Sequence, residues 1–489
     1  MKKKIIASVC AALMLVSSLA GCGSKSSKTV GDKNQINLRF SFWEPSTGKE
    51  TETALQKVVD SYKIDHPNIN IELVAQSPSG YQDWIKAQMA VNDLPEIQMN
   101  GAGQLIEMGK NGVVENIGEA FDSPNPYNEN KIWKDTFVDG ALDGAHEYRV
   151  ANEYNIPLFG TGVAMFYNKE IYNELGLSIP KDWNEFIANC EVIKNAGKVP
   201  IAWMGQKKDQ LSWLFYELSG DLYMEKFMDN AKLNYNGDNY ISKNEQVKAI
   251  LNGDFNIAND KELQADFKLL CEYIQKHLAY APNGSGFDEA AAKTLFLSGK
   301  AAHLTTGSWD IVGLLFNDEV DIDVGVFKYP KLTKENSEYA IGRGISNNCY
   351  QAIAISSTVK KQEGAREAAV DFLMYLTSPE QYSVFIDGVK SIPTVKDVKV
   401  DDIYNAFMEE GGYPYIQIFR SGDENVGVSP WNVLENVAAG KDVKLNDKLF
   451  ADIQKSLESW AETEAERNKI TKENDYLIDT LPLVGGKRK

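Results

Sequence analysis

The sequence predicts an α/β protein that contains more than one domain. The chain has 489 residues, which is beyond the size at which one hydrophobic core usually stops growing. Segments with an apolar residue at every second position alternate with segments of helical periodicity. This alternation is typical of parallel sheets that are covered by helices.

The first part of the chain predicts a regular succession of strands and helices. In order, they are strand 36–42, helix 54–62, strand 69–73, helix 81–91, strand 96–99 and helix 103–110. Pro67 closes the first helix, because proline cannot continue the helical hydrogen bonding. In open sheets of this kind, ligands bind beyond the carboxyl ends of the strands. We therefore expect Trp43, Glu44 and Asn100, which follow predicted strands, to lie near a binding site.

A second region of the same type begins at residues 155–167, which are apolar. It continues with helices 171–175 and 183–195, strand 201–204 and a mostly helical stretch at 211–280. Phe159 lies in its first strand and Trp203 at the end of a later strand. Both are aromatic candidates for contact with a ligand.

The N-terminus has the pattern of an export signal. Lys2, Lys3 and Lys4 precede an apolar run over residues 5–19, which is too short to span a bilayer. The residues before Cys22 look like a bacterial lipobox, so we expect a signal peptide at 1–21 and a diacylglycerol-linked Cys22, since two acyl chains anchor durably. The polar residues 22–33 are expected to be a flexible tether. A plain secreted protein is the alternative.

Charge and cysteine content narrow the possible partners. The chain has 51 basic and 69 acidic residues, a formal charge of −18, and loss of the signal would make it −21. A balance this acidic argues against binding of nucleic acid, which needs a basic surface. Cys190, Cys271 and Cys349 are far apart and odd in number, so free thiols are the first interpretation, with one disulfide left open.

Several short motifs, taken in order, resemble the family 1 extracellular solute-binding proteins, the lipid-anchored receptors of bacterial ABC importers. They are the strand at 37–43, DHPNINI at 65–71, NDLPEI at 92–97, FYNK at 166–169, GKAA at 299–302 and GSW at 307–309. Each motif alone is weak, but their order over about 400 residues is specific. Two departures are Glu96, where the family usually has aspartate, and a longer chain.

The resemblance implies a two-lobe periplasmic-binding-protein-like fold of type II, with a hinge and a cleft between the lobes. By analogy, the chain would cross between lobes near Asn155, Thr305 and Tyr350. Lobe one would then comprise 34–153 plus 306–349, and lobe two 154–305 plus 350–489. The implied protein is a monomer that captures a carbohydrate by hinge closure and delivers it to the permease subunits of an ABC importer. It is expected on the extracellular face of the cell membrane, which it would contact through its lipid anchor only.

A sugar presents weakly apolar faces surrounded by hydroxyl groups, so its site needs aromatic rings and polar side chains of fixed geometry. The candidate residues share this chemistry and a place at a strand end or a predicted crossing: Trp43, Glu44, Asn100, Phe159, Trp203, Trp309 and Arg343. Trp309 is the strongest of them, because it directly follows the second predicted crossing, where members of the family often stack substrate. Arg343 is flanked by glycines that allow the backbone to approach a ligand.

Enzymatic alternatives find little support in the motifs. The nucleophile elbow G-x-S-x-G and the phosphate loop are absent, and the four histidines lack metal-binding spacing. We expect no catalytic residues, no metal and no cofactor. Three alternatives remain: a receptor for a polyol, glycerol phosphate or another solute, a surface glycosidase or esterase, and a structural lipoprotein that binds no solute.

Overall fold

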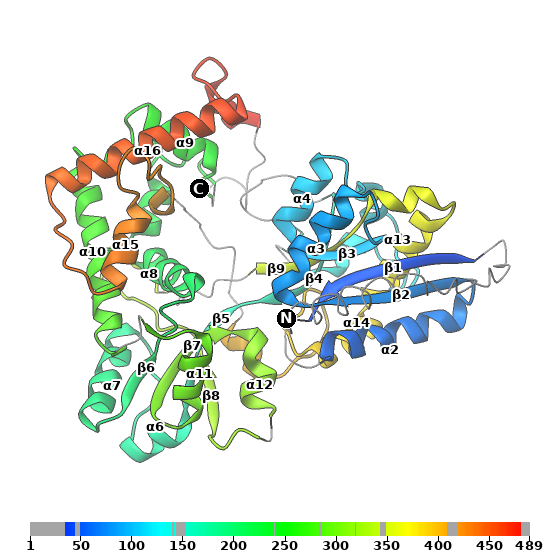
Figure 1. The fold of residues 1–489 in the computed structure, drawn as a ribbon, viewed down its shortest axis with the longest axis horizontal. Helices are drawn as coiled ribbons and strands as arrows, with labels where there is room; N and C mark the ends of the chain where they lie inside the picture. Colours follow the sequence, from blue (N-terminus) through cyan, green and yellow to red (C-terminus); the bar gives the residue numbers. More distant parts are fainter. Residues whose placement is uncertain are drawn as a thin grey trace, which may run out of the picture.

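Two separate β-sheets divide the molecule into two lobes (Figure 1). The computed structural model describes residues 35–44, 49–138, 141–142, 153–238, 240–282, 286–317, 319–342, 349–407 and 418–480. The first sheet has the strand order β2-β1-β3-β9-β4, and the second has the order β6-β7-β5-β8. We call lobe one the first sheet with the helices packed on it, and lobe two the second sheet with its helices.

Lobe one is built from segments at the start and toward the end of the chain. Its strands are β1 (Ile36–Trp43), β2 (Ile69–Gln76), β3 (Ile97–Gly101), β4 (Ile156–Thr161) and β9 (Cys349–Ile355). Its helices are α2 (Glu50–Asp65), α3 (Pro78–Ala90), α4 (Ala102–Lys110), α5 (Gly118–Phe121), η1 (Trp133–Thr136), η4 (Ser357–Lys361), α13 (Ala365–Leu376) and α14 (Pro379–Val389). Leu38, Phe40 and Phe42 point into the core formed with α2, α13 and α14, as the alternation of side chains in a strand requires.

Lobe two contains the second sheet and a larger number of helices. Its strands are β5 (Val163–Asn168), β6 (Val199–Ala202), β7 (Ala301–Gly307) and β8 (Val324–Phe327). Its helices are α6 (Lys169–Leu175), α7 (Trp183–Asn195), α8 (Lys208–Asp229), α9 (Lys243–Leu251), α10 (Lys261–Leu278), α11 (Glu289–Leu297), η3 (Ser308–Asp310), α12 (Ile311–Leu315), η5 (Asp402–Ala406), η6 (Ile418–Arg420), α15 (Pro430–Ala438), α16 (Asp447–Asn468) and η7 (Asp475–Thr480).

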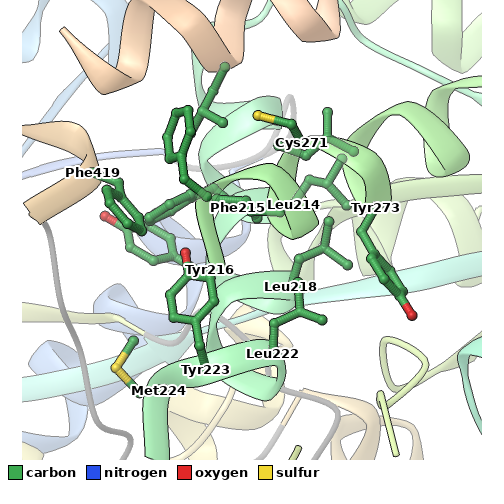
Figure 2. Packing of buried hydrophobic residues seen from close by; sticks show 14 of the residues in the cluster. Leu214, Phe215, Tyr216, Leu218, Leu222, Tyr223, Met224, Cys271, Tyr273 and Phe419 are labelled. Atoms are coloured by element: carbon green, nitrogen blue, oxygen red, sulfur yellow. The ribbon is translucent and has the colours of Figure 1, made fainter. Parts of the chain in front are cut away.

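Both faces of the second sheet are buried. Met165 and Tyr167 of β5 face a large core with α7, α8, α10, α15 and α16, whereas Ala164 and Phe166 face a smaller core with α11 and α12. Figure 2 shows the centre of the larger core, where residues of α8 meet Cys271 and Tyr273 of α10 and Phe419 of η6. A sheet buried on both faces gives lobe two a rigid frame for residues at the ends of its strands.

The predicted strands and helices agree with the structure, except for shifts of a few residues at their ends. Residues 155–167, expected to begin the second region, form two strands, and Gly162 between them joins β4 of lobe one to β5 of lobe two. Glu96, the departure from the resembled family, binds Arg39 through both of its carboxylate oxygens. They accept from Arg39 Nε at 3.1 Å and Nη2 at 3.0 Å, and from its backbone N–H at 2.8 Å.

The predicted division of the chain between the lobes differs from the strand pairing. Residues 306–349 were expected in lobe one, but β8 pairs with β5 in lobe two. Residues 350–489 were expected in lobe two, but β9 lies between β3 and β4 in lobe one, and α13 and α14 cover the same sheet. The reason is that these strands pair with strands far away in the sequence, and local sequence patterns do not predict such long-range pairing.

The crossings between lobes are displaced accordingly. The predicted crossing at Thr305 lies within β7, a strand of lobe two. The chain passes from lobe one to lobe two at Gly162 and returns before Cys349, close to the predicted Tyr350. It enters lobe two again between α14 and η5, since Tyr404 packs in the smaller core of lobe two. This last crossing, over 390–401, was not predicted.

Two further expectations concern the cysteines and the membrane. Cys190 and Cys271 are free and buried, which confirms the free-thiol interpretation for these two residues. Burial raises the pKa of the Cys271 thiol to about 12, so the thiol is unreactive at neutral pH.

Among the helices of the described ranges, none combines the length and the apolar character needed to cross a bilayer. The predicted signal peptide, tether and Cys22 lie outside the described residues.

Candidate functional site

The carboxyl ends of three strands form one edge of the first sheet. β1 and β3 are parallel to each other, and β4 runs in the same direction because both β3 and β4 pair antiparallel with β9. Trp43, Asn100 and Phe159 therefore stand at or near the same edge. Figure 1 shows this edge turned toward lobe two. The position is the one expected for ligand binding in an open α/β sheet.

A small pocket, partly open to solvent, lies where the two lobes meet. Its lining residues come from both lobes and from the last crossing: Glu44, Glu50, Thr51, Phe159, Thr161, Ser308, Trp309, Val312, Val389, Lys390 and Ser391. A pocket with walls from two bodies changes shape when the bodies move relative to each other. It can therefore respond to hinge motion.

Trp309 forms part of the wall that lobe two contributes. It lies in η3, directly after β7, and is half-buried. A Cβ atom on Gly307 would lie 2.1 Å from Trp309 Cζ3, so the indole lies flat against the backbone of a glycine. The indole also contacts Trp213 of α8, with ring centroids 5.5 Å apart and the rings tilted by 51°, and Lys207 Nζ lies 5.8 Å from the centre of its ring.

A network of ion pairs fixes the segment that carries Trp309. Lys207 Nζ lies 2.7 Å from Glu289 Oε2, and Lys293 Nζ lies 2.8 Å from Glu289 Oε1 and 2.7 Å from Asp310 Oδ1. Asp310 also accepts a hydrogen bond of 2.6 Å from the hydroxyl of Thr306. Although burial opposes ionisation, Lys207 and Lys293 lower the pKa of Glu289. The network has no net charge, and it holds the residues on both sides of Trp309.

Glu44 lies in the wall that lobe one contributes, where it caps helix α2. Its two carboxylate oxygens accept hydrogen bonds from the backbone N–H groups of Thr51 at 3.0 Å and Glu52 at 3.1 Å. Burial raises the pKa of the Glu44 carboxyl, while the two N–H groups favour its charged form. The carboxylate is thus fixed in direction, and it still lines the pocket.

The structure brings some of the predicted site residues together and separates others. Glu44, Phe159 and Trp309 line the pocket, although the Phe159 side chain is only 2% exposed and packs in the core of lobe one. Trp43 and Asn100 do not line the pocket, and both contact residues of α3. Trp43 packs on Tyr81, with ring centroids 5.1 Å apart. Trp203 is buried in the larger core of lobe two, where its ring meets that of His277. In this conformation Trp203 has almost no surface to offer a ligand.

Arg343 lies outside the described residues. The sequence did not point to eight of the residues that line the pocket: Glu50, Thr51, Thr161, Ser308, Val312, Val389, Lys390 and Ser391. Ser308 adjoins Trp309 in the GSW motif, which could have identified it. Lys390 and Ser391 belong to the unpredicted crossing, so no signal placed them there.

The described residues contain no group of three or more His, Cys, Asp or Glu side chains arranged to hold a metal ion. The pocket instead combines the Trp309 indole with carboxylates and hydroxyl groups. That composition suits a neutral ligand rich in hydroxyl groups.

Comparison with known proteins identifies the family. The model of the bacterial extracellular solute-binding protein family matches residues 46–383. The chain belongs to this family. Its members are solute-binding proteins rather than enzymes. The match spans both lobes and the first two crossings between them.

Individual relatives agree with this assignment. The chain is 24% identical over 397 residues to a multiple sugar-binding protein of Streptococcus mutans, a match that covers 78% of this chain and 80% of the relative. RafE from Streptococcus pneumoniae, in its apo form, superposes with a TM-score of 0.60 at 19% identity, covering 88% of this chain and 99% of RafE. Maltose-bound MalE3 of T. maritima gives a TM-score of 0.58 at 17% identity, covering 87% and 99%. These two likenesses confirm the two-lobe, type II binding-protein fold.

Proposed function

We propose that this protein captures a neutral sugar or oligosaccharide between its lobes and delivers it to the permease of an ABC importer. The observation that carries the proposal is the pocket at the lobe junction, with Trp309 on one wall and Glu44 and Phe159 on the other. The indole offers a face for the C–H groups of a sugar ring, and the carboxylate accepts hydrogen bonds from hydroxyl groups. Family membership and the sugar-binding relative support the same assignment.

Ligand binding would favour a closed arrangement of the lobes. Only in that arrangement does one molecule contact both walls of the pocket, so its binding free energy stabilises the closed state. The last crossing supplies Lys390 and Ser391 to the pocket and also links the lobes. The closed state would be the signal that the permease recognises.

The ligands named for similar solved structures favour a ligand longer than one sugar ring. RafE is known in complex with raffinose, and another structure of the same fold is a chitin oligosaccharide binding protein. We therefore expect an oligosaccharide rather than a monosaccharide.

Charge argues against the alternative of a phosphorylated solute. Of the described residues that line the pocket, Lys390 is the one cation, and its Nζ lies 2.6 Å from Asp387 Oδ1. Glu44 and Glu50 place negative charge in the same pocket. A polyol remains a second candidate, because its hydroxyl groups would satisfy the same carboxylates.

We further propose that the mature protein is a monomer held at the extracellular face of the cell membrane by a lipid on Cys22. The lysines, the apolar run and the lipobox-like residues before Cys22 support this proposal. Mass spectrometry of protein from membranes tests it. A diacylglyceryl cysteine at the mature N-terminus is the expected result, and an unmodified N-terminus elsewhere would contradict it.

A thermal-unfolding screen tests the proposed ligand class. The panel consists of raffinose, stachyose, maltotriose, a chitin trisaccharide and xylotriose, with galactose, sorbitol and glycerol 3-phosphate for comparison. A sugar present at one hundred times its dissociation constant stabilises the folded state by about 2.7 kcal/mol, which gives a clear rise in Tm. We expect at least one oligosaccharide to raise Tm more than galactose, sorbitol and glycerol 3-phosphate do. A larger rise with glycerol 3-phosphate, or no rise with any compound, would contradict the proposal.

Replacement of Gly307 by alanine tests the position of the Trp309 indole without removing the ring. The φ angle of Gly307 is −101°, so the backbone accepts alanine, but the new methyl group collides with the indole. We expect the ring to be displaced and the affinity for the best sugar of the panel to fall about tenfold, close to the loss of one aromatic contact. Isothermal titration calorimetry measures the change.

Gly313→Ala is the matched control for Gly307→Ala. Gly313 lies in the neighbouring helix α12, and no heavy atom of the described residues is within 4 Å of its added Cβ. The Gly313→Ala variant should bind the best sugar of the panel with the same affinity as the unaltered protein. Equal affinities for both variants would show that the indole position does not matter for binding.

A further inference from the structure

Asn100 is a nearly fully buried polar residue near the carboxyl end of β3. It is 1% exposed and pairs with Ala352 of β9 in the sheet. Its neighbour Gly101 ends β3 and precedes helix α4. A buried amide group has to find hydrogen-bond partners for both its oxygen and its nitrogen. Those partners determine which of the two atoms is left to bind a ligand.

The orientation of the Asn100 amide is fixed by its neighbours. Its Oδ1 accepts a hydrogen bond of 2.9 Å from the backbone N–H of Gly101. A backbone N–H can only donate, so the atom next to it must be the oxygen and not the nitrogen. The oxygen accepts a second hydrogen bond of 2.9 Å from Gln82 Nε2 of helix α3.

A second amide supports the same direction of hydrogen bonding. Because Gln82 donates through its nitrogen to Asn100, its oxygen is left to accept. That oxygen lies 3.4 Å from Gln104 Nε2 of helix α4, which donates to it. Gln104, Gln82 and Asn100 therefore form a chain of amides in which each donates to the next. The direction of the whole chain follows from the backbone N–H of Gly101.

The nitrogen of Asn100 remains without an acceptor in the described part of the chain. Two donors already occupy the oxygen, so the group can offer a ligand only N–H. Resting on the function proposed above, we infer that Asn100 is a specificity-determining residue that donates a hydrogen bond to an acceptor oxygen of the bound oligosaccharide. Gln82 and Gln104 are its positioning residues. A ring oxygen, a glycosidic oxygen or a hydroxyl oxygen whose proton points elsewhere can accept this bond.

The variants Asn100→Asp and Asn100→Ala test whether the Asn100 amide donates a hydrogen bond to the ligand or only fills space beside it. Aspartate keeps the oxygen that Gly101 and Gln82 contact but replaces the N–H donor with a second acceptor. We expect both variants to bind the best oligosaccharide of the panel about tenfold more weakly, as loss of one well-placed hydrogen bond implies. Binding by Asn100→Asp that equals or exceeds that of the unaltered protein would overturn the inference. Circular dichroism confirms that both variants are folded.

Gln82→Glu tests the positioning role. A carboxylate at this place cannot donate to Asn100 Oδ1, and it attracts the Asn100 nitrogen away from the cleft. We expect a loss of affinity similar to that of Asn100→Ala. Gln88→Glu, on the same helix, adds the same charge at a residue whose side chain takes no part in the hydrogen bonds of this chain of amides, and this variant should bind normally. Equal affinities of the Gln82 and Gln88 variants would exclude the positioning role.

These results are separable from a failure of the proposed function. If the unaltered protein binds no sugar of the panel, the proposed function fails and this inference fails with it. If the unaltered protein binds and both Asn100 variants bind equally well, only this inference fails.

Discussion

Replacement of Trp309 by alanine is expected to weaken oligosaccharide binding more than about tenfold, or about 1.4 kcal/mol. A stacked ring contributes about 0.5–1.5 kcal/mol beyond the apolar area that it buries, so the loss of both exceeds this threshold. The indole is held in place before a ligand arrives by its contacts with the backbone of Gly307 and with Trp213. Little binding free energy is then spent on ordering it.

The folded state should tolerate the loss of Trp309. The residue is half-buried, and the ion pairs of Lys293 with Glu289 and Asp310 hold the η3 segment without the indole. We therefore expect the Tm without sugar to change little, whereas the rise of Tm with sugar should disappear at concentrations that stabilise the unaltered protein. Titration calorimetry and thermal unfolding on the same samples measure both quantities.

Trp460→Ala is the control for this prediction. Trp460 is a half-buried tryptophan of α16 in the same lobe, and it does not line the pocket. Loss of affinity in Trp309→Ala but not in Trp460→Ala supports a specific contact with the indole. If Trp309→Ala binds normally, the residue does not belong to the site.

Local sequence patterns predicted the strands and helices up to residue 280, but they did not predict how the strands pair, and no strand or helix was predicted beyond that residue. The alternation of Leu38, Phe40 and Phe42 with polar residues fixes a strand and its buried face. Such an alternation does not specify which strands become neighbours. β3, for example, pairs with β9, which lies more than two hundred residues later in the chain. The lobe boundaries depend on such long-range pairs, so they were placed incorrectly where β8 and β9 divide between the sheets.

The site shows the same limit at the level of single residues. A tryptophan after a strand has the same local signature whether it faces a cleft, as Trp309 does, or a core, as Trp203 does. The difference comes from helices that pack over Trp203 and from the glycine beneath Trp309. Glu44 was expected as an acceptor for hydroxyl groups, and the structure adds that its carboxylate caps α2. That cap depends on the first turn of α2 lying next to the end of β1.

Acidification from pH 7.5 to pH 5 is expected to destabilise the protein through two buried histidines of lobe two. Burial lowers the pKa of His277 to about 3 and that of His303 to about 4. His303 Nδ1 donates to the carbonyl of Pro200 at 2.8 Å, and its Nε2 accepts from the hydroxyl of Tyr172 at 2.6 Å. Both ring nitrogens of His303 are thus satisfied in the neutral form. His277 lies among the rings of Trp183, Phe186 and Tyr329.

The sign follows from proton binding in the two states. Below the ordinary histidine pKa of about 6.5, the unfolded chain takes up protons that the folded protein cannot accept. The free energy of unfolding therefore decreases as the pH decreases. At pH 5 each histidine lowers it by about 2 kcal/mol, and together they lower it by about 4 kcal/mol. Urea unfolding at pH 7.5, 6 and 5 measures this loss. The range stays above the ordinary pKa values of carboxyl groups, which limits their contribution.

His277→Phe isolates the contribution of one of the two histidines. Phenylalanine fits a site lined by aromatic rings but cannot take up a proton, so the variant should lose only about half as much stability between pH 7.5 and pH 5. Its stability at pH 7.5 can differ from that of the unaltered protein, because the hydroxyl of Tyr329 loses its partner at 3.0 Å, but the slope against pH does not depend on that offset. An unchanged slope would mean that His277 is protonated in the folded protein. The core of lobe two would then have to hold a buried charge that no described neighbour compensates.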